Sequence, residues 1–160
     1  MQTLVALAPA ISAIVATVVA FLGILTLVKA VVEYVGQNKL KRYEKFQEMS
    51  RRFDENPDIA QICELVIKDS PELANISKYR KEVVICFFEE VAVLNNSRIL
   101  PKNLIVNSFG YYAIKCYESK FFWSNLDKHE LFYGLFTGFC EEMLSAKKKI
   151  TLEDIRSIGV

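Results

Sequence analysis

The chain has little of what most enzymes need. Its 160 residues include one histidine, His129, and six glycines that are scattered instead of forming a phosphate-binding loop. The GxSxG and HExxH motifs of hydrolases are absent. A single histidine also cannot form a His-rich metal site. We therefore predict a protein that is not an enzyme, with no catalytic residue, no bound metal and no cofactor.

Paired cysteines and an excess of one charge are missing as well. The four cysteines stand alone in apolar patterns, without the spacing of a zinc site or the density of a disulfide scaffold. We predict that all four are reduced core residues; they are Cys63, Cys86, Cys116 and Cys140. The 20 basic and 19 acidic residues leave a formal net charge of +1, which argues against a broad surface for duplex DNA. This balance still allows a local basic patch for a small anionic ligand.

Charge is absent altogether from one stretch near the N-terminus. Residues Leu4 to Val28 carry no charged side chain, and an uncharged run of about 25 residues is the length at which an α-helix crosses a hydrocarbon core of about 30 Å. A signal peptide would place a basic residue before a shorter apolar run, and no Lys or Arg precedes this one. We therefore predict a retained transmembrane helix without an internal ion pathway.

Basic residues flank only one end of this run. Lys39, Lys41, Arg42 and Lys45 follow it, whereas the other flank offers only the terminal amine. Positive flanks stay in the cytoplasm. We predict a single-pass protein of the inner (cell) membrane, with its N-terminus outside and its soluble domain in the cytoplasm. The basic side chains are then either solvated or in contact with anionic lipid headgroups.

Small residues recur along one face of the predicted span. Ser12, Ala16, Ala20 and Gly23 are four, four and three residues apart, and such rows are typical of transmembrane packing interfaces. Two interpretations stay open: the anchor self-associates, or the row reflects the general frequency of Ala and Gly in membrane helices.

The rest of the sequence predicts an all-α fold. Apolar residues recur every three to four positions, and no segment alternates like a strand bounded by hairpin turns. We expect a transmembrane anchor (1–36), a juxtamembrane amphipathic helix (37–55) and a cytosolic helical domain (56–160), with a bundle of about five helices after the span. The apolar stripe of the amphipathic helix faces either its own domain or a second copy.

Capping and turn residues predict where these helices begin. Asn56-Pro57 and Ser70-Pro71 are start signals, and Thr151 to Asp154 resembles a cap before a short C-terminal turn. Longer helices are expected at 77–94, 101–120 and 127–146.

Some side chains of these helices carry specific expectations. The predicted core side of the first long helix consists of Tyr79, Val83, Cys86, Phe87, Val91 and Leu94, widened by Val84, Ile85 and Phe88. Glu89 and Glu90 on the same helix need a cationic or hydrogen-bonding partner. The expected core residues of the last helix are Leu131, Phe132, Leu135, Phe136, Phe139 and Met143. In the same helix, Gly134 and Gly138 stand four apart and would permit a close helix crossing.

A polar and basic set interleaved with aromatics surrounds the turn near residue 98. Arg and Lys can contact phosphate, Asn amides can read base edges, and Tyr rings can stack on bases. The candidate ligand-binding residues are Asn96, Arg98, Lys102, Asn103, Tyr111, Tyr112 and Lys115. We expect Arg98 and Lys102 to bind phosphate and Tyr111 or Tyr112 to stack. The alternative is an ordinary turn followed by core aromatics.

The spacing of aromatics and charges over residues 50–145 resembles a bacterial family of membrane-anchored helical domains of unknown function. The segments that carry the resemblance are Tyr79–Glu82, Phe87–Glu89, Asn96–Pro101, Phe109–Tyr112, Tyr117 and Phe122-Trp123. Chain size, the single membrane segment and the helical domain are also similar to the small membrane effectors of type III CRISPR antiviral systems. That resemblance implies binding of a cyclic oligoadenylate, typically cyclic tetra-adenylate, followed by damage to the membrane.

Three hypotheses follow. The first is a membrane effector in antiviral defence that binds a cyclic oligoadenylate and responds by oligomeric rearrangement, as a homo-oligomer with a tetramer favoured, because a symmetric ligand fits repeated surfaces. The second is a membrane-tethered scaffold that recruits a protein partner through an exposed apolar groove. The third, a membrane-bound hydrolase, requires His129 or the Glu89-Glu90 pair to lie in a cleft.

Overall fold

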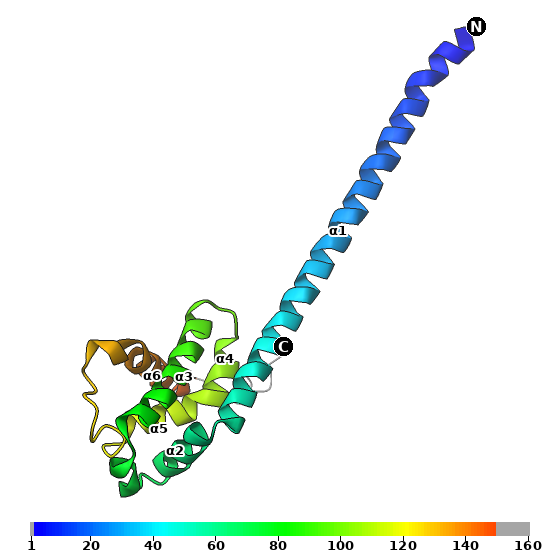
Figure 1. Ribbon diagram of the computed structural model, residues 1–160. Helices are drawn as coiled ribbons and strands as arrows, with labels where there is room; N and C mark the ends of the chain where they lie inside the picture. The colour runs from blue at the N-terminus through cyan, green and yellow to red at the C-terminus, as the bar shows by residue number, and fades with distance from the viewer. Residues whose placement is uncertain (1, 150–160) are drawn as a thin grey trace. The chain divides into compact units, whose positions relative to one another are not determined.

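The computed structural model describes the backbone of residues 2–149 and the side chains of residues 18–149 (Figure 1). Over this range the protein is all-helical, with no β-strand. The predicted fold class is therefore confirmed. The side chains of Ser12 and Ala16, and the predicted cap at Thr151–Asp154, lie outside the described residues.

The first helix is continuous over far more than the predicted span. Helix α1 runs from Gln2 to Glu55, and the chain divides within it into two units, 1–41 and 42–160. In the described part of the first unit the large apolar side chains are exposed, and Lys29 pairs with Glu33 at 3.7 Å. Within residues 18–149, α1 is the one helix that is long and apolar enough to cross a membrane.

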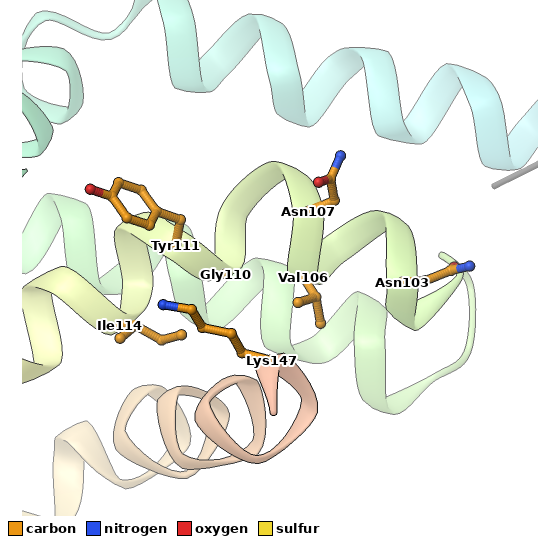
Figure 2. A pocket seen from close by; sticks show the side chains of 7 residues that line it. All are labelled: Asn103, Val106, Asn107, Gly110, Tyr111, Ile114 and Lys147. Carbon is orange, nitrogen blue, oxygen red and sulfur yellow. The ribbon is translucent and has the colours of Figure 1, made fainter. Parts of the chain in front are cut away.

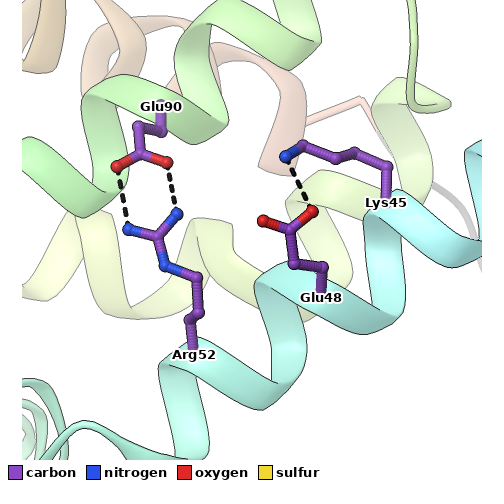
Figure 3. A network of polar contacts seen from close by, with 4 residues as sticks. All are labelled: Lys45, Glu48, Arg52 and Glu90. Atoms are coloured by element: carbon purple, nitrogen blue, oxygen red, sulfur yellow. Dashed lines mark hydrogen bonds and ion pairs between the residues drawn. The ribbon is translucent and has the colours of Figure 1, made fainter.

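The second unit begins with the last turns of α1, which carry an apolar stripe. Met49 is fully buried, and Phe53 lies against Phe87 and Phe109 with ring centroids 5.5 and 5.7 Å apart. The stripe therefore faces its own domain. Figure 3 shows the polar side of the same turns, where the two terminal nitrogens of the Arg52 guanidinium group, Nη1 and Nη2, donate to the Glu90 carboxylate at 2.5 and 2.8 Å.

Four helices close a ring around the core of this unit. They are α2 (Pro57–Ile67), α3 (Lys78–Asn96), α5 (Tyr111–Glu118) and α6 (Gly134–Lys147), and each contacts two of the others. Asn56 caps α2, because its side-chain oxygen accepts from the backbone N–H groups of Asp58 and Ile59. Ser70 caps the 3₁₀ helix η1 (Pro71–Asn75) in the same way. Both predicted starts are confirmed.

Helix α3 is the central element, and its buried face departs from the predicted one along one edge only, since Phe87, Val91 and Leu94 are buried as predicted. Val84, Ile85 and Phe88 are buried, whereas Tyr79 is 73% exposed and Cys86 is exposed. The predicted face contained more apolar residues than one side of the helix buries. The edge of the helix that carries Tyr79 and Cys86 faces solvent. The prediction of four buried cysteines is therefore wrong for Cys86 and confirmed for the other three.

The segment predicted as one helix over 101–120 contains a wider turn. It consists of α4 (Lys102–Ile105), the π-helical turn η2 (Val106–Gly110) and α5. A Cβ atom at Gly110 would lie 3.3 Å from Met143 Sδ, so the π turn brings the backbone close to α6. Single-sequence periodicity carries no signal for the extra residue of a π turn.

The last helix begins later than predicted. Residues 127–130 form turns, Leu131–Tyr133 is the 3₁₀ helix η3, and α6 begins at Gly134. Tertiary bonds hold this segment out of the helix: Lys128 Nζ donates to the Tyr117 carbonyl at 2.8 Å, and Tyr133 Oη donates to Glu82 at 2.9 Å. Leu131 and Phe132 are consequently 92% and 83% exposed, which corrects their predicted place in the core.

Candidate functional site

Arg98 sits in a strained backbone position just after α3. Its N–H donates to the Asn95 carbonyl at 3.0 Å, and the N–H of Ile99 donates to the Leu94 carbonyl at 3.1 Å. These two bonds form a Schellman motif, in which the residue at Arg98 adopts the left-handed conformation, here with φ of 54°. Glycine is the usual residue there, because any side chain costs energy in this conformation. An arginine at such a position is a reason to look for a function.

Arg98 lines a polar cavity of about 500 Å³ in the second unit. We call this cavity the arginine pocket; its lining residues are Arg42, Asn95, Asn96, Arg98, Leu100, Pro101, Lys102 and Glu142. Within residues 18–149, the guanidinium group of neither Arg42 nor Arg98 has a hydrogen-bond or ion-pair partner. Two unpaired guanidinium groups at the rim of one cavity favour an anion, because each can bind phosphate or carboxylate oxygens in a bidentate manner.

Glu142 supplies the one carboxylate of the arginine pocket. It accepts from Asn95 Nδ2 at 2.8 Å and pairs with Lys102 Nζ at 2.6 Å. Burial raises the pKa of Glu142, but the hydrogen bonds from Lys102 and Asn95 outweigh it and leave the pKa below its usual value. Lys102 is therefore paired with a carboxylate of the protein, whereas the two arginines pair with no carboxylate of residues 18–149.

A second, smaller cavity of about 230 Å³ lies beside the π turn (Figure 2). Its floor is apolar, formed by Val106, Gly110 and Ile114, and Asn103 and Tyr111 stand at its edge. Figure 2 shows the Lys147 side chain extending from α6 across the cavity. This combination of an apolar floor and a few polar groups is typical of a small-ligand subsite.

The structure brings only some of the predicted ligand residues together. Asn96, Arg98 and Lys102 line the arginine pocket, whereas Asn103 and Tyr111 line the smaller cavity. Tyr112 packs on Phe53, with ring centroids 4.9 Å apart. Lys115 borders another small cavity and lies 5.9 Å from the Tyr111 ring. The seven residues therefore do not form one cavity.

Sequence reasoning missed three residues of the arginine pocket. Arg42 stood among basic residues assigned to the membrane flank, and Glu142 lies 40 residues beyond its partner Lys102. Asn95 is in the last turn of α3, and its side chain is buried and bonded to Glu142. Tertiary packing of α6 and of the last turns of α1 on α3 brings these groups together, so no local motif predicts them.

A third cavity, of about 610 Å³, is lined by both glutamates of the hydrolase hypothesis. Glu90 is bound to Arg52, whose hydrogen bond lowers the pKa of Glu90. Burial raises the pKa of the neighbouring Glu89. His129 is exposed and does not line this cavity. Glu90 is therefore engaged in an ion pair, and Glu89 shares this cavity with Glu82, Cys86 and Tyr133.

Comparison with protein-family models, with curated proteins and with solved structures finds no match for this chain. Its function is therefore inferred from the residues and cavities described above.

Proposed function

We propose that this protein is a single-pass membrane effector whose cytoplasmic helical domain binds a phosphate-bearing ligand in the arginine pocket. The ligand expected from the sequence resemblance is a cyclic oligoadenylate, with cyclic tetra-adenylate as the first candidate. The proposal rests on Arg42 and Arg98, which share one cavity and whose guanidinium groups have no partner among residues 18–149. It assigns no catalytic step to the protein.

The chemistry of the arginine pocket supports an anion with hydrogen-bonding groups. The guanidinium groups match phosphate oxygens, and the amides of Asn95 and Asn96 can donate to or accept from a base or ribose. The carboxylate of Glu142 accepts hydrogen bonds, which suits a ribose hydroxyl better than a second phosphate. A ribonucleotide phosphodiester combines these properties.

The apolar part of α1 is the part of the protein that would act on the membrane. A helix with this composition tethers the domain to a bilayer, and the basic residues after it orient the domain toward the cytoplasm. A cyclic ligand with repeated adenylates is best shared by several identical subunits. Ligand binding would then rearrange the oligomer, a tetramer in the simplest case, and the anchors would perturb or permeabilise the inner membrane.

Calorimetry on the full chain in detergent micelles tests ligand binding. We expect cyclic tetra-adenylate to bind at micromolar concentration or tighter, and Arg42→Ala or Arg98→Ala to weaken binding at least tenfold, as expected for loss of a charge-assisted hydrogen bond. Arg51→Ala is the matched control, because Arg51 lies on the same helix, pairs with Glu55 and is outside the pocket. No heat of binding for the wild type, or equal losses in the control, would overturn the proposal.

A second candidate function is a membrane-tethered scaffold for a protein partner. The observation in its favour is the exposure of Leu131 and Phe132, since bulky apolar side chains on a surface often mark an interaction site. This function predicts that Phe132→Ser abolishes capture of the partner and that Arg98→Ala does not. The calorimetric experiment separates the two candidates, because a scaffold has no affinity for the nucleotide.

A further inference from the structure

The smaller cavity beside η2, which we call the π-turn cavity, is surrounded by polar groups that form no bond within the subunit. Asn107, Tyr111 and Lys147 line it, and their polar side-chain groups have no hydrogen-bond or ion-pair partner among residues 18–149. All three side chains are exposed, Tyr111 to 42%. Three such groups around one cavity are free to bind a ligand.

The walls of the π-turn cavity come from two helical faces that are far apart in the sequence. Val106, Gly110 and Ile114 are four residues apart and form one apolar wall. The other wall is the end of α6, where Met143 is fully buried and Lys147 follows one turn later on the same side of the helix. A Cβ atom at Gly110 would lie 3.3 Å from Met143 Sδ, so the two walls meet there. Figure 2 shows the Lys147 side chain extending across the cavity between them.

The π turn is a second indication of a ligand site. A π turn contains more residues than an α-helical turn, is rare, and frequently lies at a functional site. Val106 and Gly110 are the two ends of η2, and Asn107 lies within it. The wider turn therefore forms the wall of the π-turn cavity.

The size and lining of the π-turn cavity suit one planar group of a larger ligand. Its volume of about 230 Å³ is below the roughly 300–1,000 Å³ of sites that enclose a whole drug-sized ligand. Val106 and Ile114 offer apolar surface to the face of a ring, and the Tyr111 ring at the edge can stack on one. The Asn107 amide can both donate and accept hydrogen bonds, which matches the edge of a heterocycle. This lining favours a heterocyclic base over a purely apolar group such as an acyl chain.

The π-turn cavity and the arginine pocket share two helices. Lys102 of α4 lines the arginine pocket, and the next residue, Asn103, lines the π-turn cavity. On α6, Glu142 lines the arginine pocket and Lys147 lines the π-turn cavity. Residues 142 and 147 of an α-helix are about 7.5 Å apart along its axis. A ligand that carries both a phosphate and a base can therefore reach both cavities.

We propose that the π-turn cavity is a base subsite, which holds a heterocyclic base of the ligand whose phosphate lies in the arginine pocket. The base lies against Val106 and Ile114 and stacks on Tyr111, and the Asn107 amide bonds to its edge. Lys147 covers the base from α6. The base subsite rests on the proposed function, and it lets the phosphate-binding and stacking residues act on one ligand from two cavities.

Methyl NMR of the full chain in nanodiscs, with ¹³C-labelled isoleucine methyl groups, tests whether a base enters the π-turn cavity. We expect adenosine, which has no phosphate, to shift the Ile114 methyl signal, and Ile114→Val identifies this signal by its loss. Ile62 is the matched control, because it is fully buried in α2 and lies outside the cavity. An Ile114 signal that moves with neither adenosine nor cyclic tetra-adenylate would overturn the base subsite.

Calorimetry with cyclic tetra-adenylate tests the stacking residue. Tyr111→Ala should weaken binding about tenfold, as expected for the loss of one base–aromatic stack, whereas Tyr111→Phe keeps the ring and should bind nearly as well as the wild type. Tyr79→Ala is the matched control, because Tyr79 is an exposed tyrosine outside the π-turn cavity. An unchanged Ile62 methyl signal shows that each variant is folded. Equal affinities of Tyr111→Ala and Tyr79→Ala would overturn the base subsite.

The two experiments separate the base subsite from the proposed function. If Arg98→Ala weakens binding of cyclic tetra-adenylate and Tyr111→Ala does not, the phosphate site stands and the base subsite falls. If adenosine shifts the Ile114 signal and cyclic tetra-adenylate does not bind, the base subsite stands and the proposed function falls.

Discussion

Lys81 Nζ lies 2.7 Å from Asn125 Oδ1, across 44 residues of sequence. Lys81 is fully buried, and the same ammonium donates to the Phe121 carbonyl at 3.2 Å and to Ser124 Oγ at 3.3 Å. Burial lowers the pKa of Lys81. A single side chain of α3 thus holds the irregular segment between α5 and η3 in place. Its partners are uncharged oxygen atoms and not a carboxylate.

Replacing this lysine by a residue of similar length and no polarity should destabilise the domain. We expect Lys81→Met to reduce the free energy of unfolding by about 1–3 kcal/mol, because buried oxygen atoms lose their donor. Trp123 is the only tryptophan of the chain, so its fluorescence follows unfolding of this unit in the full-length protein. Lys120→Met, at an exposed position, is the control. Equal stability of the two variants would contradict the role of Lys81.

Local sequence signals predicted the elements better than the contacts between them. The caps at Asn56 and Ser70 act through neighbours two or three residues away, so their helices were predicted correctly. The turns before α6 depend on Lys128 and Tyr133, whose partners Tyr117 and Glu82 are 11 and 51 residues distant. The apolar residues of this segment recur with helical spacing, so the sequence predicted a helix. The tertiary bonds that prevent the helix leave no signal in the local sequence.

The arginine pocket followed the same rule. Asn96, Arg98 and Lys102 belong to one turn, and their proximity in the sequence is enough to bring them into one cavity. Arg42 and Glu142 reach that cavity from α1 and α6, so the sequence alone did not associate them with it. The predicted aromatic partner Tyr111 borders a different cavity, because the π turn separates it from Arg98.

Arg98→Gly should separate stability from ligand binding. Glycine adopts the left-handed conformation at the end of α3 without strain, so we expect the free energy of unfolding to rise by about 1 kcal/mol. Loss of the guanidinium should weaken binding of cyclic tetra-adenylate at least tenfold if the arginine pocket holds the phosphate. Thermal unfolding and calorimetry on the same sample measure both effects. A variant that is more stable and binds normally would leave Arg98 without a part in ligand recognition.

The Arg52–Glu90 pair predicts an acid-sensitive contribution to stability. The hydrogen bond from Arg52 lowers the pKa of Glu90 below 4.5, so the folded state favours the carboxylate. The contribution is therefore present at neutral pH and is lost as the pH falls below about 4.5. Both side chains are about half exposed, which limits the effect to about 1 kcal/mol.

Glu90→Gln measured by Trp123 fluorescence tests this. We expect the variant to be less stable than the wild type at pH 7, and this difference to shrink as the pH falls below about 4.5. Glu55→Gln is the control, because it removes the partner of Arg51 from an exposed ion pair within α1. A difference between Glu90→Gln and the wild type that does not change with pH would assign the effect to packing instead of charge.

Gly138, inside α6, and Gly110, which contacts α6, should respond differently to replacement by alanine. Gly138 is exposed with open space at its Cβ position, so Gly138→Ala should raise the free energy of unfolding by about 1 kcal/mol through helix propensity alone. Gly110 is buried, and a Cβ there would lie 3.3 Å from Met143 Sδ, so Gly110→Ala forces the Met143 side chain to move and should lose that benefit. Chemical denaturation of the full chain, at a concentration where it does not self-associate, compares the two. If Gly138→Ala were destabilising under these conditions, glycine would be required at this position within the single subunit.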